Sequence, residues 1–191
     1  MKTIVWDVDD VLNCLTKEWF ENYWLKKNPD CKISYSQINK NPPFEILSIS
    51  LEEYLQSLDN FRKNNFHNLK PVKEILNWFN INGNNYRHIA LTATPLEISG
   101  ISAEWVLKYF GKWIRSFNFV PSKRNTDSII YYDKNKAEFL TQFKNIDIFI
   151  DDSEININDV KNIGIKTLLF PQPWNSNANT SLMDFLNKIN I

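Results

Sequence analysis

The sequence predicts an α/β fold in which helices cover both faces of a parallel β-sheet. Several apolar, β-branched runs of strand length show little alternation of polar and apolar residues, which is typical of strands buried on both faces. Amphipathic helical segments separate these runs over most of the chain. The 191 residues, 43% of them hydrophobic, suit one globular domain with a single core. We therefore expect a Rossmann-like three-layer sandwich.

The first part of the chain begins with a strand and continues with helices. Residues 3–8, TIVWDV, form the first predicted strand, and an amphipathic pattern predicts a helix over residues 15–27. Residues 28–50 contain several prolines and no sustained period, which indicates a loop with at most one short helical turn. A capping box that starts at Ser50 opens a second helix over residues 50–66.

From about residue 70 onward, helices and strands alternate. The predicted helices cover residues 69–83, 97–111, 134–143, 157–163 and 181–189. The predicted strands cover residues 86–94, 116–120, 146–152 and 166–170. Five strands connected by helices in this way are typical of a parallel sheet.

One connection is too long for a simple strand-helix-strand unit. About 75 residues separate the first two predicted strands, whereas such a unit needs about 30. We therefore predict an α/β core formed by residues 1–13 and 71–191, with a small helical cap inserted at residues 14–70. In α/β sheets such an insertion stands over the carboxyl ends of the strands, where ligands bind.

Charge and composition exclude several classes of partner. Lys plus Arg and Asp plus Glu number 22 each, and no block of basic residues is present that could follow a nucleic-acid polymer. No apolar run approaches the roughly 20 residues of a membrane span. Cys14 and Cys31 lack metal-site spacing, and the first residues do not resemble a signal peptide, so we expect a cytoplasmic protein.

Acidic residues gather where two predicted strands end. Asp7, Asp9 and Asp10 follow the first strand, and Asp151 and Asp152 end the strand at 146–152. Because the carboxyl ends of parallel strands share one edge of a sheet, neighbouring strands would bring these carboxylates together. Like charges at such distances repel strongly unless a cation compensates them. Hard oxygen ligands favour Mg²⁺.

Other residues at the same edge suit an anionic group. Thr92 and Thr94 end a strand in hydroxyls, and Lys134 and Lys136 lie at a predicted helix start. Arg124, after the strand at 116–120, is a further candidate for contact with a substrate anion. Each feature alone has an ordinary structural explanation, such as a helix cap or a solvated lysine. Together and in this order they indicate a phosphate site beside a divalent metal.

The order DVDDVLN, LTAT, a lysine and IDD resembles the four-motif pattern of the haloacid dehalogenase superfamily, whose members are mostly Mg²⁺-dependent phosphohydrolases. The helical insert after the first motif resembles members with a small helical cap, and the 5'-deoxynucleotidase-like phosphatases are closest in shape. The resemblance implies a HAD-like five-stranded parallel sheet with the first strand central. The strand that carries the last acidic motif would lie beside it.

The resemblance also implies catalytic roles. Asp7 would attack phosphorus and form an aspartyl-phosphate, and Asp9 would act as general acid and then general base. Thr92 would hydrogen-bond the transferred phosphoryl group, and a lysine would screen its charge. Lys136 is preferred to Lys134 because it directly precedes the apolar stripe of its helix.

The metal ligands implied are Asp7, Asp9 through its backbone carbonyl, Asp151 and Asp152. Asp10 stands where many family members have glycine, and it receives no role. The lysine segment also departs from the common Lys-Pro form. Neither departure removes a catalytic group.

The function expected is therefore a Mg²⁺-dependent phosphomonoesterase acting on a small phosphorylated metabolite, such as a nucleoside or deoxynucleoside monophosphate. Two alternatives stay open, namely a binding or regulatory module with little turnover, and a phosphotransferase or phosphomutase. A 2-haloacid dehalogenase is not favoured, because that chemistry needs no metal. The nucleotide hypothesis depends on the resemblance, and the sequence does not predict an oligomeric state.

Overall fold

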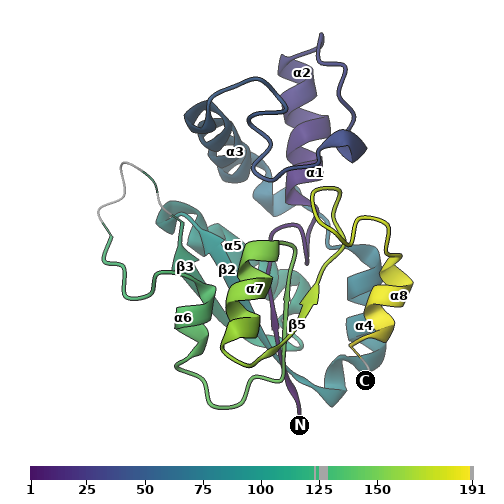
Figure 1. Cartoon of the computed structure of the whole chain (residues 1–191), viewed down its shortest axis with the longest axis vertical. Helices are drawn as coiled ribbons and strands as arrows, with labels where there is room; N and C mark the ends of the chain where they lie inside the picture. Colours follow the sequence, from purple (N-terminus) through teal and green to yellow (C-terminus); the bar gives the residue numbers. More distant parts are fainter. Residues whose placement is uncertain (123, 125–128, 190–191) are drawn as a thin grey trace.

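The computed structural model describes residues 1–122, 124 and 129–189. Figure 1 shows an α/β body with a smaller group of helices, which contains α1 and α3, standing beyond one edge of the sheet. Within the described residues, no helix combines the length and the apolar character needed to cross a membrane.

The described residues form a sheet of five parallel strands. They are β1 (Thr3–Trp6), β2 (Arg87–Thr94), β3 (Ile114–Pro121), β4 (Ile148–Asp151) and β5 (Lys166–Leu169), in the spatial order β3-β2-β1-β4-β5. Central β1 pairs with both neighbours, and Val5 lies opposite Ile89 on one side and Phe149 on the other. The predicted α/β class and the central position of the first strand are confirmed. All five carboxyl ends therefore lie at one edge.

Helices cover both faces of this sheet. The helices of the body are α4 (Lys73–Asn82), η4 (Gly83–Asn85), α5 (Leu96–Phe110), α6 (Lys136–Leu140), α7 (Glu154–Asn162) and α8 (Leu182–Asn187). Ile4 and Trp6 of β1 belong to a core cluster with residues of α4, α5 and α8. Val5 points to the other face, where it joins a second cluster with residues of α6 and α7. This alternation produces the three layers.

Trp6 links β1 to the helices beneath it. Its ring lies 5.0 Å from that of Phe79, and its indole N–H donates to His88 Nδ1 at 3.0 Å. His88 Nε2 lies 2.9 Å from the Gly83 carbonyl oxygen, so both ring nitrogens of this buried histidine have partners. Burial lowers the pKa of His88. His88 is therefore a structural residue.

In the sequence, the remaining helices lie between β1 and α4. They are α1 (Leu15–Trp19), the π-helical turn η1 (Phe20–Trp24), α2 (Leu25–Lys27), η2 (Tyr35–Gln37), α3 (Leu51–Asn65) and η3 (Phe66–Asn68). Trp19 packs edge-to-face on Tyr54, with ring centroids 5.2 Å apart, and also contacts Trp24. These aromatic side chains therefore hold the helices to one another.

The chain leaves the body and returns to it at one place. Asn13 forms an antiparallel bridge with Pro71, and the Val72 N–H donates to the Leu12 carbonyl oxygen at 2.8 Å. We call residues 14–70 the insert. Its helices stand beyond the carboxyl end of β1 (Figure 1).

Several element boundaries differ from those predicted; for example, β1 ends at Trp6 rather than at residue 8. The third strand is longer than residues 116–120, and α6 is shorter than residues 134–143. Helix α7 begins at Glu154 rather than near residue 157, because the Ser153 side chain accepts a hydrogen bond from the Asn156 N–H and caps the helix.

Candidate active site

Neighbouring strands β1 and β4 bring three acidic residues together. Asp7 directly follows β1, and its N–H donates to the Ile150 carbonyl oxygen at 2.9 Å. Asp151 is the last residue of β4, and Asp152 follows it. One carboxylate oxygen from each of Asp7, Asp151 and Asp152 lies within 4.8 Å of the others, and all three residues are buried. Strand pairing therefore converts two distant sequence motifs into one cluster.

Lys136 is the cation of this cluster. It is the first residue of α6, and its Nζ lies 2.8 Å from Asp7 Oδ1 and 2.7 Å from Asp151 Oδ2. Burial alone would lower the pKa of this lysine, but the carboxylates of Asp151 and Asp7 together raise it. Lys134 is exposed, so the structure brings Lys136 rather than Lys134 to the carboxylates.

The cluster has more acidic groups than Lys136 alone can compensate. Three ionised carboxylates against one ammonium group would leave two negative charges, the amount that one divalent cation compensates. Burial raises the pKa of Asp7 to about 8, with Lys136 opposing this rise, and it also raises the pKa of Asp152 well above its usual value. The buried oxygens are hard ligands. The charge and the donor atoms both fit a divalent metal.

The two acids at the end of β4 have different surroundings. Asp151 Oδ1 accepts from the Ser153 N–H at 2.9 Å, the Asn156 amide lies 3.1 Å from both carboxylate oxygens, and Lys136 occupies Oδ2. For Asp152, the Trp174 indole N–H donates to Oδ2 at 2.8 Å. Among the described residues, Asp152 Oδ1 has no hydrogen-bond partner. Asp152 is therefore better placed than Asp151 to bind a cation directly.

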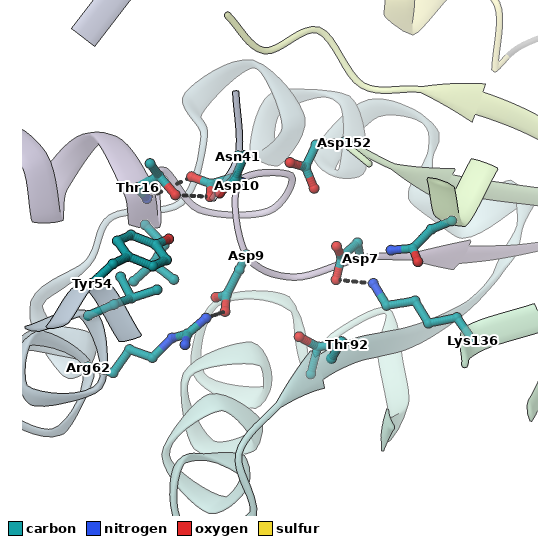
Figure 2. A pocket seen from close by; sticks show the side chains of 14 residues that line it. Asp7, Asp9, Asp10, Thr16, Asn41, Tyr54, Arg62, Thr92, Lys136 and Asp152 are labelled. Carbon is teal, nitrogen blue, oxygen red and sulfur yellow. Dashed lines mark hydrogen bonds and ion pairs between the residues drawn. The ribbon is translucent and has the colours of Figure 1, made fainter. Parts of the chain in front are cut away.

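Asp7 is held on one side only. Its Oδ1 accepts from the Val8 N–H at 2.7 Å and pairs with Lys136, whereas its Oδ2 has no hydrogen-bond partner in the described part of the chain. Thr92, near the end of β2, is buried beside it, and its hydroxyl likewise has no partner among the described residues. Figure 2 shows Thr92 next to Asp7 at the cavity.

A cavity of about 150 Å³ lies between the body and the insert. Four aspartates, Thr92 and Lys136 line it on the side of the sheet. The insert contributes Leu15, Thr16, Asn41, Tyr54, Leu58 and Arg62. One wall is therefore mainly anionic, and the other combines apolar side chains with an arginine and a phenol (Figure 2).

Asp9 faces the insert rather than the carboxylate cluster. Its Oδ2 accepts from Arg62 Nη2 of α3 at 2.8 Å, and its Oδ1 accepts from the Asn13 amide at 3.2 Å. Arg62 also donates to Asp59 at 3.1 Å, and Asp59 in turn binds Arg124. Arg124, a predicted candidate for substrate contact, thus pairs with an acid of the insert.

Asp10, which has no predicted role, connects three segments. Its φ of 61° is in the left-handed region that glycine favours, and its carboxylate accepts from both the N–H and the hydroxyl of Thr16. The Gln172 side chain, from the loop after β5, donates to the Asp10 carbonyl oxygen at 2.6 Å. Burial raises the pKa of Asp10 to about 7. Asp10 therefore fixes the loop after β1 against the insert.

Sequence reasoning missed Arg62 and Asn156. Arg62 follows Tyr54 and Leu58 at four-residue steps, so it lies on the buried face of α3, and an arginine on such a face is a usable signal. Asn156 lies in the first turns of α7, just after the acidic pair. Trp174, in the loop after β5, donates a hydrogen bond to Asp152 and orients it.

Comparison with known proteins identifies the fold. No family model and no curated protein sequence matches the chain. Among solved structures, a haloacid dehalogenase-like family hydrolase from Streptococcus pneumoniae has a TM-score of 0.63 at 14% identity, over 98% of this chain and 90% of that chain. A second Streptococcus pneumoniae hydrolase has a TM-score of 0.60 at 15% identity, over 100% of both chains.

A Bacillus subtilis protein described as a HAD-hydrolase, solved with bound magnesium, has a TM-score of 0.54 at 12% identity. That match covers 88% of this chain and 86% of the other. Because the sequence identities are this low, the likeness shows the fold alone. The sheet order observed here agrees with it. The chain therefore has the haloacid dehalogenase-like fold.

Proposed function

We propose that this protein is a Mg²⁺-dependent phosphomonoesterase that forms an aspartyl-phosphate on Asp7. One observation carries the proposal. Asp7 has one carboxylate oxygen fixed by Lys136 and Val8, while the other has no partner among the described residues, in a cluster of three buried acids that could hold a metal ion. A carboxylate held in this way suits nucleophilic attack on a phosphoryl group.

The proposed metal ligands are the carboxylates of Asp7 and Asp152 and the backbone carbonyl of Asp9. Asp151, already bound by Lys136 and Asn156, would act through a water molecule or as a further direct ligand. Mg²⁺ at this place would supply the positive charge that lets an anionic phosphoryl group approach a carboxylate. The bound magnesium of the Bacillus subtilis neighbour is consistent with this choice.

In the first step, Asp7 Oδ2 forms a bond to phosphorus and the bond from phosphorus to the ester oxygen breaks. Asp9 donates a proton to the leaving oxygen, so the product departs as an alcohol. Lys136 screens the charge between Asp7 and the phosphoryl group, and Thr92 donates a hydrogen bond to a phosphoryl oxygen.

In the second step, Asp9 accepts a proton from a water molecule as the water oxygen attacks phosphorus. The bond from phosphorus to Asp7 Oδ2 breaks, which releases inorganic phosphate and restores both carboxyl groups. Division of one difficult displacement into two easier steps is the benefit of the covalent route.

We infer that residues 14–70 act as a cap over a core formed by residues 1–13 and 71–191. The pairing of Asn13 with Pro71 at the base of the insert supports this division, and a closed cap would exclude water from the site. The cavity between the body and the insert would hold the substrate, which we propose to be a small phosphorylated metabolite such as a nucleoside or deoxynucleoside monophosphate.

Hydrolysis of 3-hydroxypropyl phosphate with and without Mg²⁺ tests the proposal. We expect release of inorganic phosphate that depends on Mg²⁺, and a loss of at least about 10³-fold in kcat/KM for Asp7→Asn. Asp10→Asn is the matched comparison, because Asp10 is also buried but binds Thr16. In this variant kcat/KM should fall by no more than about tenfold. Metal-dependent hydrolysis by Asp7→Asn at the wild-type rate would refute the assignment.

A further inference from the structure

The insert presents a buried positive charge to the cavity. Arg62 of α3 is only 6% exposed, and it donates to Asp9 at 2.8 Å and to Asp59 at 3.1 Å. Arg124 binds the same Asp59 through both carboxylate oxygens, at 2.8 Å and 3.1 Å. Two arginines therefore share one aspartate, and Asp9 supplies the second negative charge of this group of four.

This arrangement conflicts with the proposed role of Asp9. Both oxygens of Asp9 accept hydrogen bonds from groups other than a substrate, and its carboxylate points toward Arg62 while that of Asp7 lies on the other side, toward Lys136 (Figure 2). To reach an ester oxygen on phosphorus, Asp9 must leave Arg62. That movement would leave the buried guanidinium of Arg62 with only Asp59, an acid that it shares with Arg124, and a buried cation with too little counter-charge is unfavourable.

Unpaired donors on the same wall point to a missing ligand. Within the described residues, Arg62 Nε is buried without a hydrogen-bond partner. Tyr54, two helical turns earlier on α3, also lines the cavity, and its hydroxyl forms no hydrogen bond with another described residue. A buried guanidinium N–H without a partner is rare unless a ligand or water completes it. A guanidinium and a phenol hydroxyl suit an anionic oxygen group.

We propose that the natural substrate has a second anionic oxygen group, a carboxylate or a phosphate, in its leaving part, and that Arg62 and Tyr54 bind this group. This inference rests on the proposed phosphomonoesterase function. The substrate anion replaces Asp9 on Arg62, so Arg62 keeps a counter-charge while Asp9 takes up a proton from solvent and turns to the ester oxygen. Binding of the correct leaving group thus completes the catalytic arrangement.

A charge series of short esters tests the proposal with the wild-type protein alone. The probes are 2-carboxyethyl phosphate, 3-hydroxypropyl phosphate and 3-aminopropyl phosphate, which have similar length and carry a negative, a neutral and a positive terminal group. We expect kcat/KM to fall by at least about tenfold at each step of this series. Propane-1,3-diol bisphosphate is the fourth probe, and it distinguishes a second phosphate from a carboxylate.

Variants locate the preference. The quantity compared is the selectivity ratio, which is kcat/KM for the preferred anionic ester divided by kcat/KM for the hydroxyl ester. Arg62→Gln should lower this ratio to about one, and Tyr54→Phe should lower it by about three- to tenfold. Lys63→Gln is the matched control, because this neighbour on α3 is exposed and pairs with Glu97 outside the cavity. Its ratio should equal that of the wild type.

Two results would overturn the inference while leaving the proposed function intact. The first is Mg²⁺-dependent hydrolysis of the hydroxyl ester at a kcat/KM equal to or above that of both anionic esters. The second is an anionic preference that persists in both Arg62→Gln and Tyr54→Phe. If the wild-type protein hydrolyses none of the four esters, the proposed function falls and the inference falls with it.

Discussion

The two walls of the cavity are built in different ways. On the side of the sheet, ionic groups lie at strand and helix ends and have several partners, as Lys136 has in Asp7 and Asp151. On the side of the insert, helix α3 presents Tyr54 and Arg62, and Arg62 Nε is buried without a partner among the described residues. The first wall is mainly anionic and would bind a cation and the phosphoryl group, whereas the second contains a cationic side chain and would bind the leaving part of the substrate.

This difference separates the chemistry from its selectivity. Side chains fixed at the ends of parallel strands are preorganised, which favours a reaction that depends on charge and position. A helix of the insert can move relative to the sheet, and its unpaired donors can form hydrogen bonds with a ligand. We therefore expect substitutions in the first wall to affect every ester, and substitutions in the second to affect the choice among esters.

The largest effect should come from removal of the lysine of the first wall. Lys136→Met leaves Asp7 and Asp151 buried without their cation, and we expect a loss of about 3–5 kcal/mol in the free energy of unfolding. We also expect kcat/KM to fall by about 10²- to 10³-fold for all esters. Urea unfolding and phosphate release measure the two quantities.

Lys134→Met is the control for this change, because Lys134 is exposed two residues earlier. It should alter the free energy of unfolding by no more than about 0.5 kcal/mol. Equal losses in the two lysine variants would show that Lys136 has no special place in the cluster.

A smaller effect should be seen in how pH and Mg²⁺ change the stability of the protein. The pKa values of Asp7 and Asp10 are raised by burial to about 8 and about 7, and that of Asp152 is raised as well. The folded metal-free protein therefore binds more protons than the unfolded chain between about pH 4 and pH 8. The contribution of these three groups to the free energy of unfolding should be fully present below this range and should be lost as the pH rises through it.

Added Mg²⁺ should raise the Tm more at pH 8 than at pH 5, because at pH 5 the metal must displace protons from these carboxyl groups. Calorimetry with EDTA or with Mg²⁺ at the two pH values measures the difference. Asp152→Asn should weaken it. An equal rise of the Tm with Mg²⁺ at both pH values would contradict the proposal that Mg²⁺ binds these carboxyl groups.

The smallest effect should come from a residue that orients a proposed ligand. Trp174→Phe removes the indole N–H that donates to Asp152 Oδ2, so the Mg²⁺ concentration for half-maximal activity should rise by about tenfold. Trp113→Phe is the comparison, because that indole donates to Asn84, which does not line the cavity. A change of similar size in both variants would mean that the hydrogen bond to Asp152 has no separate role.

The fold could be predicted because burial on both faces leaves a clear pattern in a strand. The runs around Val5, Ile89 and Phe149 are apolar on both faces, and the observed sheet places these three residues side by side. The exact ends of helices and strands were harder to predict from the sequence. The π-helical turn at Phe20–Trp24 and the early start of α7 at Glu154 depend on local hydrogen bonds that a hydrophobic pattern does not contain.

The two walls of the cavity also differ in how far sequence could predict them. The acids at the ends of β1 and β4 follow from topology, because neighbouring parallel strands end at one edge. The contact of Arg62 with Asp9 joins residues 53 positions apart and depends on how α3 packs over that edge. Only the four-residue spacing of Tyr54, Leu58 and Arg62 indicated that this arginine faces inward.

The most direct test of the central claim is chemical trapping of the phosphorylated residue. Wild-type protein turning over an ester with Mg²⁺ is quenched in acid, reduced with borohydride, digested and examined by mass spectrometry. Reduction converts the acyl phosphate of an aspartate to homoserine, and we predict homoserine at position 7. Homoserine at another aspartate, or no homoserine while phosphate is released, would contradict Asp7 as the nucleophile.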